Sequence, residues 1–191
     1  MGFIQDTVAR LERIPTATRN LMFLGILAIS VLVLLVLSLG KELFALGLLF
    51  ILGTSSLAYK RRYKGIPIGI EQVTMTTFVV GKAFGPGIGV IYGPLTAVVG
   101  QYILGNDFDA DSIPFFFGAG IVGLTAHSLP FPPLLSVLLC SLIVSFCTSL
   151  VDFFGEYEQK LYGLLFMVTH FFVTLSLWLP IGSSLLSIAA S

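Results

Sequence analysis

Long apolar runs separated by short polar segments are the main feature of this chain. Each run has roughly the length that an α-helix needs to cross the ~30 Å hydrocarbon core of a bilayer. The runs are continuous rather than alternating, which favours helices over a β-barrel. The pattern predicts an all-α, polytopic transmembrane bundle of six or seven spans, because 42–84 can be divided in more than one way. The runs cover residues 20–39, 42–58, 66–84, 87–105, 113–129, 134–153 and 161–179.

The segment before the first run, residues 1–19, is more polar. Phe3, Val8 and Leu11 fall near one face of a helix there, which predicts either a short interfacial helix or a frayed, solvated terminus. The run at 20–39 lacks an Ala-x-Ala cleavage pattern, so we interpret it as a retained span. No soluble domain interrupts the runs, and we expect residues 1–191 to form a single bundle domain.

Composition strengthens this interpretation. Hydrophobic residues make up 56% of the chain and charged residues 10%, whereas a soluble domain carries about 25% charged residues. The mean hydropathy is +1.00. These values predict an integral membrane protein whose first partner is the lipid bilayer. The formal net charge of zero argues against nucleic acid as a partner.

The basic residues indicate an orientation. Lys60, Arg61, Arg62 and Lys64 lie in one short polar segment, and three arginines precede the run at 20–39. Cytoplasmic loops carry an excess of Lys and Arg. The sequence therefore predicts a multi-pass protein of the cell membrane with both the N-terminus and the 60–64 loop in the cytoplasm.

A ladder of small residues recurs at every fourth position between residues 81 and 97. This spacing lets helix backbones approach closely in a bilayer, where packing holds helices together. Pro86 and Pro94 interrupt the ladder, which predicts a turn or a broken helix within it. The region is the sequence's best pointer to a functional site. The predicted helix-packing residues are Gly81, Gly85, Gly89, Gly93 and Ala97.

Charged residues inside the apolar runs are candidates for function, because they are rare in membranes and usually face a bundle interior. Glu71 and Gln72 are predicted either to contact a ligand or to form interfacial or interhelical hydrogen bonds. His170 has the same two alternatives, whereas Lys82 can reach the membrane surface from its helix end. The predicted substrate-binding residues are Glu71, Gln72, Gln101 and His170, with Tyr92 and Trp178 as stacking surfaces.

The sequence predicts no enzyme, no cofactor and no metal site. A Walker A sequence, a Gly-x-Ser-x-Gly elbow and a Cys-x-x-Cys pair are all absent. His127 and His170 share no metal-type spacing. The acidic segment 106–111 lacks the glycine and glutamate of a calcium loop, so we expect it to be solvated.

One stretch resembles a known family. Gly85-Pro86-Gly87-Ile88-Gly89, together with the later Gly-rich segment Phe117–Gly123, is similar to motifs of the S components of energy-coupling-factor vitamin transporters. The resemblance covers about 66–125, and chain length and span count also agree with it. It implies a bundle that binds a small, vitamin-like molecule and passes it across the membrane with an ATP-driven coupling module.

A second class of function has the same general sequence features. A non-catalytic accessory or scaffold subunit of a larger integral membrane complex also carries packing ladders and aromatic surfaces. Several buried polar groups facing one cavity would favour transport. Apolar grooves on the lipid-facing side, suited to partner helices, would favour the accessory subunit.

Overall fold

The computed structural model describes residues 40–61, 68–105 and 112–190. The predicted segments 1–19 and 20–39 lie outside these residues. The chain divides into two compact units, Met1–Phe44 and Ala45–Ser191. The described residues belong almost entirely to the second unit, so the expectation of a single bundle for the whole chain stays a prediction.

Every regular element among the described residues is helical, and none is a strand, which confirms the predicted all-α class for this part of the chain. Most helices fall within the predicted runs. Two helices are followed directly by a π-helical turn and one by a 3-10 turn, features that hydropathy does not predict. The elements are α3 (Lys41–Ser56), the 3-10 turn η1 (Leu57–Arg61), α4 (Val73–Phe84), α5 (Pro86–Val99), the π turn η2 (Gly100–Gly105), α6 (Ser112–Thr125), α7 (Pro133–Phe153), α8 (Tyr157–Leu177), the π turn η3 (Trp178–Gly182) and α9 (Ser183–Ala190).

Four helical stretches among the described residues are long and apolar enough to cross a membrane, as judged by length and composition. They are Lys41–Arg61, Pro86–Leu104, Pro133–Phe153 and Tyr157–Ala189. Two further apolar helices, α4 and α6, are shorter. The predicted span at 66–84 differs most from the structure, because residues 68–72 are not helical and α4 begins only at Val73.

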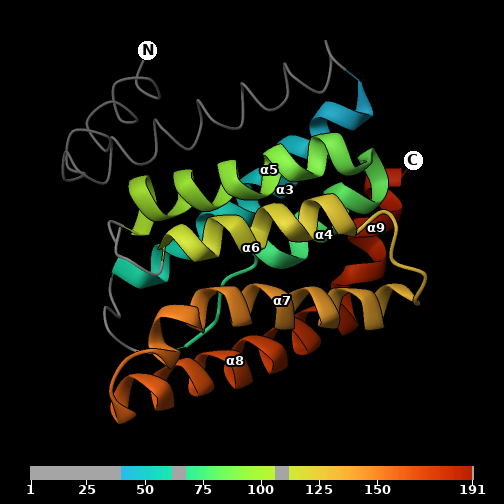
Figure 1. The fold of residues 1–191 in the computed structure, drawn as a ribbon. Coiled ribbons are helices and arrows are strands. Elements are labelled where there is room, and N and C mark those ends of the chain that lie inside the picture. Colours follow the sequence, from blue (N-terminus) through green and yellow to red (C-terminus); the bar gives the residue numbers. More distant parts are fainter. Residues whose placement is uncertain (1–39, 62–67, 106–111, 191) are drawn as a thin grey trace, which may run out of the picture. The chain divides into compact units, whose positions relative to one another are not determined.

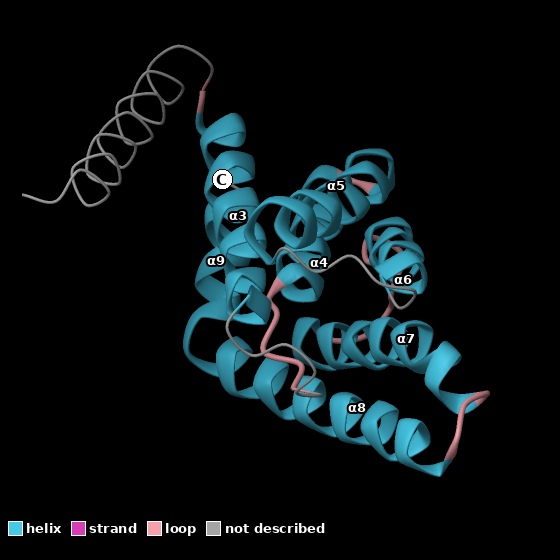
Figure 2. Ribbon diagram, turned by 90° about the vertical axis from the view of Figure 1, so that its left-hand side faces the viewer, coloured by secondary structure: helices cyan, strands magenta, loops and turns pink. Residues whose placement is uncertain are grey.

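Helix α4 lies at the centre of the second unit. It packs against α5, α6, α7 and α9, while α5 pairs with α6 and α7 pairs with α8 (Figures 1 and 2). All residues from Val73 to Gly81 are buried. This position explains why an apolar run carries Thr74, Thr76 and Thr77, since the surrounding helices shield these side chains from lipid.

The small-residue ladder brings α4, α5 and α6 into backbone contact. A Cβ added at Gly81 would lie 2.6 Å from the Gly123 carbonyl oxygen, and one added at Gly93 would lie 2.5 Å from the Ala119 carbonyl oxygen. Gly89 and Gly123 face each other even more closely. Gly85 has a different position, because it forms the α4–α5 turn with φ of 88° and has open space around it.

Candidate functional site

A non-helical segment, Ile68–Gln72, lies against the side of α8 before α4 begins. At membrane depth, irregular backbone is tolerated only where protein or a cavity surrounds it. A Cβ added at Gly69 would lie 2.9 Å from His170 Cα, so the segment passes directly against the α8 backbone. Neighbouring side chains satisfy its polar groups: Tyr59 OH donates to Ile68 O (2.5 Å), Gly69 N donates to Thr169 Oγ1 (3.0 Å), and Gln72 N donates to Ser56 Oγ (2.8 Å).

Glu71 caps the N-terminus of α4 from within this segment. Its Oε2 accepts from Val73 N at 2.6 Å and Thr74 N at 3.3 Å, and its Oε1 accepts from Thr74 Oγ1 at 3.0 Å. The first N–H groups of a helix have no intrahelical partner, and the helix dipole favours negative charge there. Glu71 is only 2% exposed. Local capping therefore accounts for part of the stabilisation of a buried charge.

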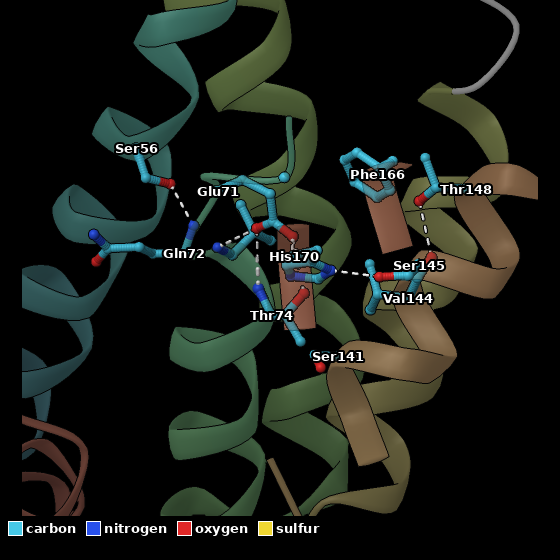
Figure 3. A network of polar contacts seen from close by, with 12 residues as sticks. Ser56, Glu71, Gln72, Thr74, Ser141, Val144, Ser145, Thr148, Phe166 and His170 are labelled. Carbon is cyan, nitrogen blue, oxygen red and sulfur yellow. Dashed lines mark hydrogen bonds and ion pairs between the residues drawn. The ribbon is translucent and has the colours of Figure 1, made fainter. Parts of the chain in front are cut away.

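His170 connects Glu71 to α7. Its Nε2 lies 2.8 Å from Glu71 Oε1, and its Nδ1 lies 2.6 Å from Ser145 Oγ (Figure 3). The Glu71 contact does not have the alignment of a hydrogen bond, and it is an ion pair only when the imidazole is protonated. Whether Ser145 donates to Nδ1 or accepts from it depends on which imidazole nitrogen carries the proton. We name Glu71, His170 and Ser145 the polar centre.

The polar centre is buried inside the second unit. His170 and Ser145 are fully buried, and the Phe166 ring centroid lies 5.6 Å from that of the imidazole. Side chains from the segment before α4, from α7 and from α8 thus meet at one point. Removing any one of them leaves a buried polar group without its partner, which costs free energy.

The order Ser145–His170–Glu71 is that of a nucleophile, a base and an orienting carboxylate. Ser145 is fully buried, and it does not line any of the three cavities described below. In the described state, the three side chains join the segment before α4 to α7 and α8.

Of the other predicted site residues, Gln72 follows Glu71 directly and is half-buried at the N-cap of α4. The remaining three lie elsewhere in the unit, and Gln101 is buried in the π turn η2. Tyr92 packs edge-on against Phe50 of α3, at a centroid distance of 6.2 Å. Trp178 packs edge-on against Phe78 of α4, at 5.5 Å. Of the six predicted binding residues, the structure brings Glu71 and His170 into direct contact.

The sequence carries a signal for Ser145. Ser141, Ser145 and Ser149 recur at every fourth position in the apolar run that became α7, and all three are buried. Ser149 Oγ donates to Gly163 O of α8 at 3.1 Å. Such a serine stripe indicates the face of a helix that packs against another helix.

Lys82 and His127 connect the far ends of α4 and α6. Lys82 Nζ donates to the carbonyl oxygens of His127 and Leu129, both at 3.3 Å, and His127 Nδ1 lies 3.3 Å from the Lys82 carbonyl oxygen. Carbonyl groups at a helix C-terminus attract cations. These contacts indicate that both residues cap helix ends rather than bind a ligand.

The described cavities are apolar. A cavity of about 510 Å³ lies between α5 and α6, lined by Val90, Pro94, Phe116, Phe117, Gly120 and other apolar residues. A second, of about 290 Å³, lies between α7 and α8 and includes Leu142, Leu164 and Phe171. A third, of about 470 Å³, borders Trp178, the start of α7 and α9. No group of three or more His, Cys, Asp or Glu side chains suited to a metal ion occurs in the described part of the chain.

Comparison of the chain with known protein families, characterised proteins and solved structures finds no match.

Proposed function

We propose that this protein is an integral membrane transport subunit that binds a small, vitamin-like molecule within its helical bundle. In this proposal it acts as the S components of energy-coupling-factor transporters do, and an ATP-driven coupling module drives the transport. It lies in the cell membrane as a multi-pass protein of six or seven spans with a cytoplasmic N-terminus. The proposal rests on the motif resemblance at 66–125 and on the polar centre.

The observation that carries the proposal is a helix that begins next to a buried charge. Transporters often place substrate sites where a helix begins within the membrane, because the exposed N–H groups and side chains there can bind polar groups. Here α4 begins at Val73, beside a carboxylate and an imidazole that are both buried. Intramembrane ionisable residues are functional candidates by default.

The polar centre supports a specific binding step. In the described state, Glu71 and Ser145 each contact the His170 imidazole. A ligand that carries a hydrogen-bonding heterocycle or amide would replace one of these internal contacts rather than fill an open polar pocket. Gln72, half-buried at the edge of the same segment, supplies an additional amide.

The apolar cavities favour a second candidate, an accessory subunit of a larger membrane complex. The α5–α6 cavity has exposed walls, with Phe117 at 70% and Leu124 at 52% exposure. A partner helix packs well into an apolar groove that contains small residues such as Gly120. An accessory subunit would not have to bind a ligand at Glu71.

Purification of the full chain in a mild detergent, followed by mass spectrometry of copurifying molecules, separates the two candidates. The transport proposal predicts a small molecule bound to the wild type and an ATPase module among the partners. The same purification of His170→Gln should lose the small molecule. A stoichiometric set of integral membrane partners without an ATPase, and without a small molecule, would favour the accessory subunit.

A further inference from the structure

The α5–α6 cavity is lined by apolar residues alone, and one of them is a proline inside a helix. Its volume of about 510 Å³ falls within the roughly 300–1,000 Å³ of small-molecule sites in proteins. None of its lining side chains carries an N–H or O–H group. The lining residues are Val90, Pro94, Ile113, Phe116, Phe117, Gly120, Ile121 and Leu124.

Pro94 deprives one backbone carbonyl of its helical donor. Helix α5 continues through this residue, from Pro86 to Val99. Each carbonyl of an α-helix accepts from the N–H four residues later, and proline has no N–H. The Val90 carbonyl therefore lacks the donor that residue 94 would otherwise supply. A backbone group without a partner is strongly unfavourable in hydrocarbon, so this oxygen favours any other donor within reach.

The Val90 carbonyl lies where α6 borders the cavity. A Cβ added at Gly120 would lie 3.9 Å from Val90 O and 3.4 Å from Pro94 Cγ, which are ordinary van der Waals distances. All three residues line the cavity. Because Gly120 has no side chain, it leaves space beside this oxygen.

The Val90 carbonyl also lies towards one end of the cavity. Helices α5 and α6 run antiparallel, as their facing pairs of small residues show. Val90 is four residues into α5, about 6 Å along its axis, whereas the α6 wall from Leu124 to Ile113 extends over about 16 Å. An occupant that donates to Val90 O therefore has most of the apolar wall beside the rest of its body, in the direction of Ile113.

We propose that the α5–α6 cavity binds a neutral lipid alcohol, whose hydroxyl group donates to Val90 O and whose hydrocarbon body lies against Phe116 and Phe117. The lining has no charged residue to pair with a charged headgroup. The acyl chains of ordinary lipids have no donor for the carbonyl. This inference is independent of the proposed function, because neither Glu71 nor His170 lines the cavity.

A comparison of two lipid probes tests the hydroxyl contact. The first probe is hexadecanol with a photoreactive diazirine in its chain, and the second is the methyl ether of the same molecule, which has no hydroxyl proton. Each is crosslinked at equal concentration to the full chain in detergent, and mass spectrometry locates the label. We expect the alcohol to label the α6 wall about fivefold more than the ether, the ratio that corresponds to one hydrogen bond of about 1 kcal/mol.

Pro94→Ala separates the carbonyl from the shape of the cavity. Alanine restores an N–H that donates to Val90 O within α5, so both probes should label this variant equally. Pro86→Ala is the matched control and should keep the preference for the alcohol, because Pro86 is the first residue of α5, where a helix does not use the N–H.

Three results would overturn the proposal. The first is equal labelling of the wild type by the two probes, which would indicate an unspecific lipid contact. The second is a preference for the alcohol that survives Pro94→Ala. The third is a cavity that neither probe labels, which would leave this surface to a partner helix.

Discussion

Glu71 Oε1 lies 2.8 Å from His170 Nε2, and this contact joins the N-terminus of α4 to the middle of α8. The same carboxylate caps α4 through Val73 N and Thr74 N. One buried charge thus has two roles, starting a helix and pairing with a neighbouring helix. The arrangement explains why an acidic residue occurs in an otherwise apolar run.

Replacing Glu71 with alanine should strongly destabilise the protein. The change removes the cap of α4 and leaves the buried His170 imidazole without its carboxylate, and a buried polar group left without its partner costs about 1–3 kcal/mol. Glu71→Gln should cost less, because the amide oxygen still caps the helix. Thermal unfolding in detergent measures both effects. Glu158→Gln, on the exposed first turn of α8, is the control and should unfold like the wild type.

Replacing Ser145 with alanine should destabilise the protein more than the same change at Ser141. Both serines are buried on one face of α7. The Ser145 hydroxyl contacts His170 Nδ1, whereas the Ser141 hydroxyl donates to Leu138 O of its own helix. Loss of the partner of a buried imidazole nitrogen costs about 1–3 kcal/mol. Equal unfolding temperatures for the two variants would contradict the contact between Ser145 and His170.

The glycines of α5 provide a test of backbone contact. Gly89→Ala should destabilise the bundle, because the new Cβ would overlap the Gly123 carbonyl group. Gly87→Ala, on the first turn of the same helix, has open space around it. It should be neutral or stabilising, since alanine in place of glycine favours helix by about 1 kcal/mol within a helix interior. If the two variants unfold at the same temperature, α5 and α6 do not approach as closely as described.

Gly69→Ala should disturb the polar centre without removing any of its polar atoms. The added Cβ would collide with the Cβ of His170 and come within 2.9 Å of its Cα, which forces the Ile68–Gln72 segment away from α8. Glu71 would then lose its contact with the imidazole. Hydrogen exchange at the first turn of α4 should increase in this variant. Gly87→Ala serves again as the control, and an unchanged exchange rate in Gly69→Ala would argue against close packing at position 69.

The helices could be predicted from the sequence because hydropathy alone determines where long apolar segments lie. The run at 134–153 agrees with α7 to within one residue at each end, whereas α8 begins four residues before the run at 161–179 and ends two residues before the end of that run. The start of α4 could not be predicted in this way. It depends on a cap from Glu71 and on the packing of Gly69 against His170, and the latter contact exists only in the folded state.

The candidate site was predictable only in part. Glu71 and His170 were identified because charge and imidazole are unusual in apolar runs, but their pairing is a tertiary contact. Ser145 was missed because a serine in an apolar helix usually bonds its own backbone. Tyr92 and Trp178 were predicted as ligand-stacking residues on residue type, and the structure places them against Phe50 and Phe78.

Native mass spectrometry of the full chain is the most direct test of the proposed binding function at the polar centre. The wild type and the Ser141→Ala control should each carry an additional small-molecule mass, and Glu71→Gln and His170→Gln should lose it while remaining folded. A wild-type mass equal to that of the bare chain, under conditions that retain its membrane partners, would contradict a small-molecule site at Glu71 and His170.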